Sequence, residues 1–541
     1  MNFKKSKLTK VSCALLTLLA INAKAEEAKN VIYVSKKEKL INNVDVLKMA
    51  SHVILFTMHP CESEPTIVCG DTFSPGISQK HPWGYVTIDD ESLKAIKTLQ
   101  SEGVKILFDM APIQSFYPKV TADPSIYEKL AISISDMINH YSIDGFDYDF
   151  EPVDINATNP DDIKSFFKTL RYLMPEKELT ITPQFYTLNS TAYRNVYDAK
   201  TSPGFFEDLS FMNVQYYDVG EKFLNIDTLL SWHRSMVSGE YARIPPEKLV
   251  TGFALGVNDT IDRWAFEPSI IANYFVVHNL ANKKLPFGGV MGWRFLNNTF
   301  YGQNWLVINH RLFQAASANL IDNTSVISPD AAFIYSSSNG LMVYKDNTWV
   351  KSKKMPYLAN KTKLLSLSNG FFTIWDGDNF IFTSNNSAPA MIDLFQLKEQ
   401  FGTTIDKIFY VVNDEKYVYI VTNVGVYRIS YNLNNDWDEP EYIGLWNMPS
   451  GGYTGAAVSK NSLFVTLNGN RGVYKYNANS GGFEPSNSGL PTYMGETTIN
   501  EIVAQKNCLR VKIFGDFYYS KNNGDSWHAW SDMPKYFDCN Y

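Results

Sequence analysis

Three features are missing from this sequence of 541 residues, and each absence narrows the class of protein. No stretch after the N-terminal region approaches the roughly 20 apolar residues of a membrane-spanning helix, so we expect no membrane span. Basic residues are not in excess. The formal net charge is −7 and the pI is about 5.7, which argues against nucleic acid or an anionic membrane as the main partner. No Cys-x-x-Cys spacing is present, which makes a zinc site the weaker explanation of the cysteines.

The first 25 residues have the pattern of a secretory signal peptide. A region with four lysines precedes an apolar run over residues 11–21, and Ala23-Lys24-Ala25 matches the small-residue cleavage site. We therefore expect cleavage near Ala25 and a secreted protein, extracellular or periplasmic. The mature chain is too long for one hydrophobic core, so two or three domains are expected.

Four cysteines remain after removal of this segment, and an even number in an exported protein suggests two disulfides. Local pairing favours Cys61 with Cys69 and Cys508 with Cys539. The first pair lies in a loop over residues 60–85, which we expect to shape one wall of a groove.

Short apolar runs alternate with helix-length segments from residue 30 to about residue 320. Eight such runs predict the α/β fold class and a (β/α)8 barrel, the TIM barrel, whose catalytic groups lie at the C-terminal ends of the strands. The expected strands are Asn30–Ser35, Ser51–Met58, Val104–Ala111, Ile143–Glu151, Leu179–Phe185, Phe211–Tyr217, Lys248–Gly256 and Gly288–Phe295, and the expected helices are Glu91–Glu102, Ser125–Tyr141, Asp161–Leu173, Ile226–Ser238, Pro268–Asn282 and Asn304–Asn319.

The fourth expected strand carries an alternating row of acids and aromatics over residues 144–151, which read Asp-Gly-Phe-Asp-Tyr-Asp-Phe-Glu. The strand period of two puts Asp147, Asp149 and Glu151 on one face and the three aromatic residues on the other. Like charges held close together raise at least one pKa, so one acid can stay protonated near neutral pH, as a general acid must. A solvated edge strand or a calcium-binding loop also carries several acids, but neither explains the aromatic residues between them.

This stretch resembles the Asp-x-x-Asp-x-Asp-x-Glu signature of glycoside hydrolase family 18, the chitinases and endo-β-N-acetylglucosaminidases. Two further segments are similar to motifs of the family: Gln215-Tyr216-Tyr217-Asp218 on the sixth expected strand and Gly288–Trp293 on the eighth. The resemblance covers roughly residues 28–320. The third strand departs from the family pattern Ser-x-Gly-Gly and reads Phe108-Asp109-Met110-Ala111-Pro112, a difference that we expect to leave the acids untouched.

The resemblance implies substrate-assisted retaining hydrolysis, in which the N-acetyl oxygen of the sugar attacks the anomeric carbon. Glu151 would protonate the leaving oxygen and then act as base, Asp149 would hydrogen-bond the acetamide N–H, and Asp147 would be buried behind Asp149. Tyr217 would hold the acetamide carbonyl oxygen, and Trp293 would stack under the sugar. No metal or organic cofactor is required. Further substrate contacts are expected from Gln215, Tyr216 and Asp218, and a structural role in the motif from Asp144 and Gly145.

The expected activity is therefore endo-acting cleavage of β-1,4 bonds between N-acetylglucosamine units in chitin or chitooligosaccharides. Cleavage of the chitobiose core of N-glycans is the alternative, because it involves the same linkage and the same acetamido groups. A non-hydrolytic lectin on the same barrel is disfavoured, since both Asp149 and Glu151 are present. The short connection over residues 256–288 predicts a shallow, open cleft.

The pattern changes near residue 321, which divides the mature chain into a catalytic domain over residues 26–320 and an all-β domain over residues 321–541. Aromatic residues recur there every 38 to 47 residues, a period typical of propeller blades, and predict a small propeller of about five blades. A β-sandwich is the alternative. The turn over residues 520–527 resembles an Asp-box. This domain would either contact the polymer or cell surface or serve as a platform. The recurring aromatic residues are Tyr344, Phe382, Tyr427, Tyr474 and Tyr518.

Overall fold

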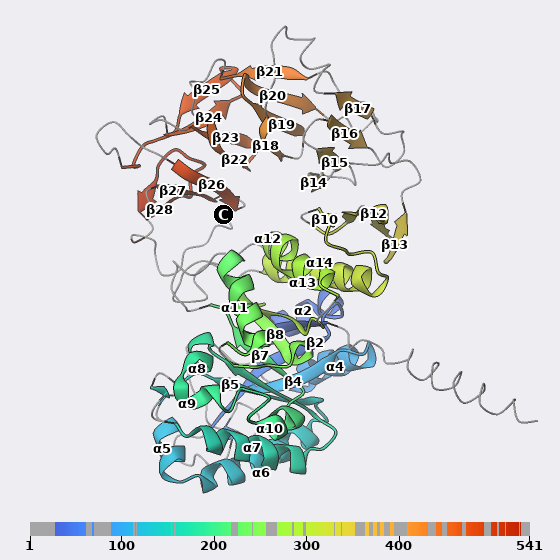
Figure 1. The fold of residues 1–541 in the computed structure, drawn as a ribbon, viewed down its shortest axis with the longest axis vertical. Coiled ribbons are helices and arrows are strands. Elements are labelled where there is room, and N and C mark those ends of the chain that lie inside the picture. The colour runs from blue at the N-terminus through green and yellow to red at the C-terminus, as the bar shows by residue number, and fades with distance from the viewer. Residues whose placement is uncertain are drawn as a thin grey trace, which may run out of the picture. The chain divides into compact units, whose positions relative to one another are not determined.

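The chain divides into two compact units, Met1–Asn323 and Thr324–Tyr541, each considered by itself (Figure 1). The structure is a computed structural model. It describes residues 28–60, 68–69, 88–111, 114, 116–152, 154–155, 158–217, 226–240, 242–255, 268–283, 286–295, 299–328, 330–336, 338–351, 363–366, 372–375, 379–383, 390–393, 408–414, 416–430, 440–445, 452–467, 472–491, 499–505, 508–513, 516–529 and 531.

Several predicted features lie outside the described residues. These are the signal peptide over residues 1–25, the cysteines Cys61 and Cys539, the site residue Asp218 and most of the loop over residues 60–85. Cys508 is disulfide-bonded, which agrees with the expectation that this cysteine is paired.

Eight parallel strands form a closed barrel in the first unit, which confirms the TIM-barrel prediction. The barrel closes because β1 pairs with both β2 and β9, and the short strand β3 (Val68–Cys69) is added antiparallel to β2. Every expected strand is present, with bounds that differ by a few residues at most. The barrel strands are β1 (Lys29–Val34), β2 (His52–Pro60), β4 (Lys105–Met110), β5 (Gly145–Phe150), β6 (Glu178–Pro183), β7 (Phe211–Gln215), β8 (Leu249–Ala254) and β9 (Gly289–Trp293).

Helices follow the strands along the chain and pack around the barrel (Figure 1). All the expected long helices are present, and α4 begins at a capping box formed by Asp89 and Ser92. None of the helices in the described part of the chain has the length and apolar character needed to cross a membrane. The helices are α2 (Lys37–Asn42), α3 (Val44–Leu47), α4 (Asp90–Ser101), α5 (Phe116–Ala122), α6 (Ser125–His140), α7 (Pro160–Leu173), α8 (Phe185–Asn189), α9 (Thr191–Arg194), α10 (Pro203–Asp208), α11 (Ile226–Ser238), η3 (Pro246–Lys248), α12 (Pro268–Ile271), the π-helical η4 (Ala272–Val276), α13 (Val277–Ala281) and α14 (Thr299–Ser317).

Strand β5 has one aromatic and one acidic face, as its alternation predicts. Phe146, Tyr148 and Phe150 are fully buried against the helix layer, where the Tyr148 hydroxyl lies 3.0 Å from that of Tyr127 on α6. Phe166 on α7 packs edge-on against Tyr148 with ring centroids 5.5 Å apart. Large rings on the outer face fix the rotation of the strand, so the acidic residues between them must point into the barrel.

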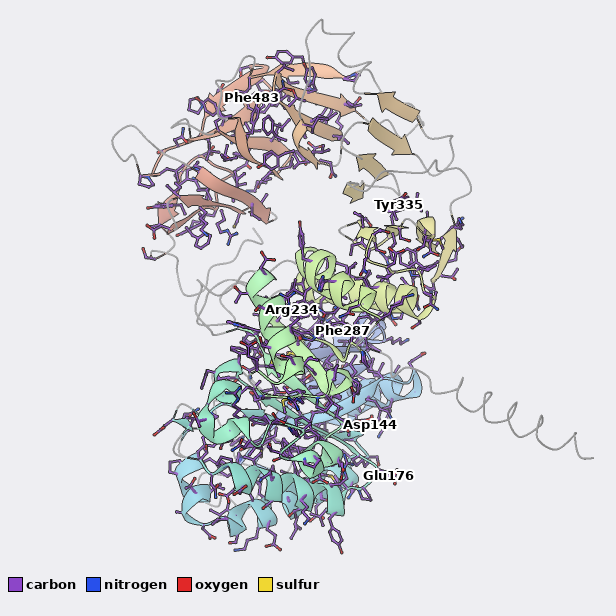
Figure 2. The ribbon with its side chains drawn as sticks, viewed as in Figure 1. Asp144, Glu176, Arg234, Phe287, Tyr335 and Phe483 are labelled. Atoms are coloured by element: carbon purple, nitrogen blue, oxygen red, sulfur yellow. The ribbon has the colours of Figure 1, made fainter. Side chains whose placement is uncertain are left out.

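The N-terminal end of β5 is fixed by Asp144 and Gly145, as the motif implies. The Asp144 carboxylate (labelled in Figure 2) accepts hydrogen bonds from the backbone N–H of Ile106 at 2.9 Å and from the Gln100 side chain at 2.7 Å. Gly145 lies against the carbonyl of Glu178 on β6 so closely that a Cβ atom would collide with it. These contacts fix the register of β5 relative to β4 and β6.

The second unit consists of five antiparallel sheets of four strands each, which confirms the predicted all-β repeat and disagrees with a two-sheet sandwich. Each recurring aromatic residue falls on the third strand of its sheet. The sheets are β10 (Val326–Ile327), β11 (Phe333–Ser336), β12 (Gly340–Lys345) and β13 (Thr348–Lys351); β14 (Lys363–Ser366), β15 (Phe372–Trp375), β16 (Asn379–Thr383) and β17 (Ala390–Asp393); β18 (Ile408–Asn413), β19 (Tyr417–Thr422), β20 (Gly425–Ser430) and β21 (Glu441–Gly444); β22 (Tyr453–Ser459), β23 (Ser462–Leu467), β24 (Gly472–Asn477) and β25 (Gly482–Pro485); and β26 (Ile499–Gln505), β27 (Cys508–Ile513), β28 (Asp516–Ser520) and β29 (His528–Ala529).

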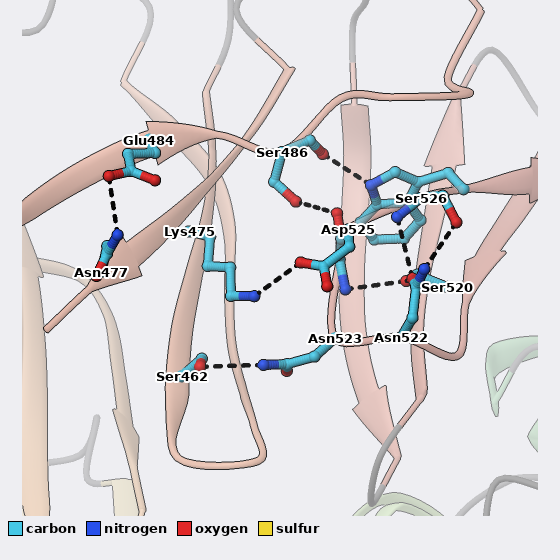
Figure 3. Close-up of polar contacts among 12 residues, drawn as sticks. Ser462, Lys475, Asn477, Glu484, Ser486, Ser520, Asn522, Asn523, Asp525 and Ser526 are labelled. Atoms are coloured by element: carbon cyan, nitrogen blue, oxygen red, sulfur yellow. Dashed lines mark hydrogen bonds and ion pairs between the residues drawn. The ribbon is translucent and has the colours of Figure 1, made fainter. Parts of the chain in front are cut away.

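The turn that follows β28 has the hydrogen bonds of an Asp-box (Figure 3). The Ser520 hydroxyl accepts from the backbone N–H of Gly524 at 2.9 Å, and the Asn522 side-chain oxygen accepts from that of Ser526 at 3.0 Å. The Trp527 indole donates to the Ser486 carbonyl at 2.7 Å. Because Ser486 follows β25, the turn also joins the fourth sheet to the fifth, which makes its role structural.

We expect Gly145→Ala to destabilise the first unit by about 1–3 kcal/mol, because the new methyl group overpacks the β5–β6 contact. The matched control is Gly204→Ala on α10, where an added Cβ meets nothing within 4 Å and a helical alanine is slightly stabilising. Thermal unfolding followed by circular dichroism measures both. Equal melting temperatures for the two variants would contradict the packing at Gly145.

Candidate active site

Three acids rise in a row from the barrel interior to its mouth along β5. Asp147 is completely buried, Asp149 is 8% exposed and Glu151, just beyond the end of the strand, is half-buried. Although part of Glu151 reaches solvent, its carboxyl group is surrounded by protein. The C-terminal end of the strands is where this fold places its chemistry, so the row occupies the expected position.

Asp147 accepts hydrogen bonds from three hydroxyl groups, two on the neighbouring strand β6 and one on β1. Tyr33 on β1 donates to its Oδ2 atom and Thr180 on β6 donates to its Oδ1 atom. The Thr182 hydroxyl lies 3.1 Å and 3.0 Å from the two oxygens. Donors converging on one carboxylate favour its charged form, so they oppose the effect of burial on the Asp147 pKa.

Asp149 and Glu151 are held together by the side chain of Gln215 at the end of β7. Its Nε2 atom donates to Asp149 Oδ1 at 3.0 Å and to Glu151 Oε1 at 2.6 Å. The backbone of Glu151 is fixed as well, because its N–H donates to the Tyr117 hydroxyl at 3.1 Å and its carbonyl accepts from Gln114 at 2.8 Å. The predicted residues Asp149, Glu151 and Gln215 therefore form one hydrogen-bonded group.

Burial raises the pKa of both acids in this group. For Asp149, the negative charges of Glu151 and Asp147 and the hydrogen bond to Glu151 raise the pKa further, while Gln215 lowers it. For Glu151, the hydrogen bonds from Gln215 and Asp149 oppose the effect of burial. Burial and the neighbouring negative charge thus favour the protonated form within this pair of acids, which is the state that a general acid needs.

Aromatic side chains form the floor beside the acids. Tyr217 is buried in the same apolar cluster as Tyr33, and Trp293 at the end of β9 packs against that cluster. The Trp293 ring meets Tyr33 edge-on at 5.4 Å and Phe56 at 5.8 Å between centroids. Since Tyr33 also donates to Asp147, one ring connects the floor to the acidic row.

Not every predicted site residue lies at the mouth. The Tyr216 ring packs against Phe185 and Trp232 and its hydroxyl lies 3.9 Å from the sulfur of Met236 on α11, so it faces the helix layer. Alternation along β7 explains this, because residues 215 and 217 point inward and residue 216 must point outward. Asp144 and Gly145 lie at the opposite end of β5 from the acids.

Sequence reasoning missed two residues near the row. Asp109 on β4 is completely buried and lies in register with Asp147, so the expectation that the unusual third strand leaves the acids untouched is wrong. In the sequence, Asp109 is recognisable only as a single acid within an apolar strand. Tyr186 on α8 is 42% exposed and donates to the carbonyl of Pro152, next to Glu151, at 3.0 Å. No pattern in the sequence places it there.

Comparison with known proteins adds the following. The family model for glycosyl hydrolases family 18 matches residues 29–377. A family 18 chitinase from Pseudoalteromonas aurantia is 20% identical, with 52% of this chain and 98% of that chain covered and a TM-score of 0.43. A putative chitinase A from Streptomyces coelicolor is 16% identical, with coverage of 53% and 99% and a TM-score of 0.40.

A third solved structure, the family 18 chitinase ChiB from the chitin utilization locus of Flavobacterium johnsoniae, is 15% identical, with coverage of 53% and 94% and a TM-score of 0.38. No curated protein matches the chain. The family model covers more than half of the sequence, across the barrel and its acidic row. The chain therefore belongs to glycosyl hydrolases family 18.

Proposed function

We propose that the protein is a secreted, endo-acting glycosidase that cleaves β-1,4 bonds between N-acetylglucosamine units of chitin or chitooligosaccharides. The observation that carries this proposal is the Asp149–Glu151 pair, which is held by Gln215 at the mouth of the barrel and has pKa values raised by burial. Secretion follows from the signal-like residues 1–25. Family membership supplies the reaction class.

In the proposed reaction, the pair supplies the proton that the leaving group needs. Glu151 protonates the glycosidic oxygen while the oxygen of the 2-acetamido group attacks the anomeric carbon, so the C–O bond to the leaving sugar breaks as the ring of the oxazolinium ion closes. Asp149 accepts a hydrogen bond from the acetamide N–H and stabilises the positive charge. Glu151, now ionised, then removes a proton from the water that opens the intermediate.

The aromatic residues of the floor orient the acetamido group in the proposed reaction. Tyr217 holds the acetamide carbonyl in line for attack, and Trp293 supports the sugar ring at the cleavage point, an effect of positioning rather than of charge. Support comes from their common cluster with Tyr33, whose hydroxyl is bonded to Asp147. Tyr186, exposed beside Pro152, is suited to contact a neighbouring sugar.

The N-glycan chitobiose core is the alternative substrate, because it has the same linkage and the same acetamido groups. Between β8 and β9, the described residues contain only the helical segment over residues 268–281, which favours an open cleft and attack within a chain. A lectin role is the least favoured, since the pair that would deliver the proton is intact.

We also propose that the second unit is a five-bladed propeller that contacts the polymer. Three successive pairs of sheets meet through their first strands, as blades around an axis do: β10 with β14, β18 with β22, and β22 with β26. A cavity of about 590 Å³ opens between the fourth and fifth sheets. Its amide, hydroxyl and charged groups suit the hydroxyl groups of a sugar. They include Lys475, Asn477, Asn479, Glu484, Ser488 and Asp525.

Glu151→Gln is expected to lower the turnover of a fluorogenic chitotrioside by about 100-fold or more, because the amide cannot donate a proton as an acid does. The fold and substrate affinity should be unchanged by circular dichroism and binding assays. A matched cellotrioside, which lacks the acetamido group, is the substrate control and should not be cleaved. Retained turnover by the variant, or efficient cleavage of the cellotrioside, would end the assignment.

Release of glycans from a high-mannose glycoprotein, measured in parallel, decides between the two substrates.

Gln215→Met is expected to shift both limbs of the pH profile of kcat/KM to higher pH by about one unit. The amide donates to the charged forms of Asp149 and Glu151, so its loss raises the pKa of both. The control is Gln100→Met, which removes an amide bonded to Asp144 at the other end of β5 and should leave the profile unmoved. Limbs that stay in place in the Gln215 variant would contradict the assigned hydrogen bonds.

A Lys475→Ala/Asn479→Ala variant of the full chain, in the Glu151→Gln background, should pull down on insoluble chitin several-fold more weakly. Both changes remove polar groups from the cavity, and the exposed Lys475–Asp525 ion pair contributes little to stability. The control is Lys351→Ala on the first sheet. Unchanged pull-down would favour the other role of the second unit, a platform for proteins or for stability.

A further inference from the structure

One buried acid next to the active site has no role in the reaction described above. Asp109 lies on β4, in register with Asp147 on β5, and both side chains are completely buried. Neighbouring residues in register on parallel strands point to the same side, so the two carboxyl groups face each other inside the barrel. Phe56 is the in-register neighbour of Asp109 on β2 and supplies no charge.

The contact between Asp109 and Asp147 requires a proton. The two side chains are in-register neighbours on adjacent strands, and within the described part of the chain neither oxygen of Asp109 has a hydrogen-bond donor. A carboxylate is only an acceptor, so two of them can form a hydrogen bond only when one is protonated. Their adjacency and burial therefore favour one shared proton over two neighbouring negative charges.

The neighbours of Asp147 decide which of the two acids holds this proton. An ionised carboxylate has about four acceptor positions. The hydroxyls of Tyr33, Thr180 and Thr182 fill three of them, and an O–H from Asp109 fills the fourth. Among the described residues Asp109 has no other donor, and burial followed by the negative charges of Asp149 and Asp147 raises its pKa well above the ordinary range.

We propose that Asp109 is a positioning residue whose protonated carboxyl group donates a hydrogen bond to Asp147 and keeps that acid ionised and fixed below Asp149. This inference rests on the proposed function. The four acids then form two proton-sharing pairs, Asp109 with Asp147 and Asp149 with Glu151. Because Asp147 is already saturated with donors, it does not compete for the proton of the upper pair, which stays available to the substrate.

The first test compares Asp109→Asn with Asp109→Leu. The asparagine keeps an N–H donor for Asp147, so Asp109→Asn should keep most of the turnover of chitotrioside. The leucine has a similar volume and no donor, so Asp109→Leu should lose about 100-fold in kcat with little change in KM. Without this donor the pKa of Asp147 rises, and the acidic limb of the pH profile should move to higher pH only in the leucine variant.

The second test needs no substrate and therefore stands if the proposed function fails. A proton held by folded Asp109 but not by the unfolded chain makes stability fall as pH rises from about 4 toward the raised pKa of Asp109. The Asp109→Asn variant has no such proton to lose, so its stability should not fall in this way. The difference between its urea unfolding midpoint and that of the wild type should therefore increase, in favour of the variant, between pH 5 and pH 8. The titratable groups that face Asp109 are Asp147, Asp149 and Glu151 on or just after β5 and Tyr33 on β1, and all remain in the variant.

Asp136→Asn, an exposed carboxyl on α6, is the control and should give no such trend. Either of two results overturns the inference. In the first, the difference in urea midpoint between Asp109→Asn and the wild type does not increase with pH. In the second, Asp109→Asn loses as much turnover as Asp109→Leu. If no N-acetylglucosamine substrate is cleaved by the wild type, the proposed function fails and the pH dependence of stability still decides the protonation of Asp109.

Discussion

The structure of the active site depends on hydrogen bonds that side chains from other strands donate to its buried carboxyl groups. Four acids lie close together, three of them along β5 and Asp109 beside them on β4, and that many charges in a largely buried site would destabilise any fold if all were ionised. Hydroxyl donors from β1 and β6, and an amide from β7, are therefore as necessary as the acids themselves. The closed barrel supplies them, because it is the arrangement that brings side chains from these separate strands to one place.

The alternation along β5 connects this chemistry to the stability of the fold. The six residues 146–151 that carry the acids also carry Phe146, Tyr148 and Phe150, whose rings are fully buried in the helix layer. A slip of one residue would put three rings in the barrel and the acids against the helices, so packing and catalysis require the same register. Asp144 and Gly145 fix that register from the other end of the strand.

The barrel fold and the acidic row could be predicted from local sequence patterns. The other residues of the site are brought together by contacts between segments that are distant in the sequence. Strand and helix periods identified the barrel, and the acidic row is contiguous in sequence. Tyr33 lies 114 residues from Asp147, so nothing local assigns it to the site. Asp109 was visible as an acid in an apolar strand, but its partner was not. Tyr216 was predicted as a site residue and faces the helix layer instead. The period of two along β7 already placed it on the outer face of the barrel.

The charge of the row explains which state of the substrate it favours. With one proton in each pair, the four acids carry two negative charges in a site of low polarity. In the proposed reaction, the N-acetylglucosamine substrate is neutral and gains little from them, whereas the oxazolinium intermediate and the transition state before it are positive and gain much more. Stabilisation of this kind lowers the barrier rather than tightening ground-state binding. Asp109 contributes by holding the lower charge on Asp147, beneath the acid that contacts the substrate, where it acts at short range on the developing cation.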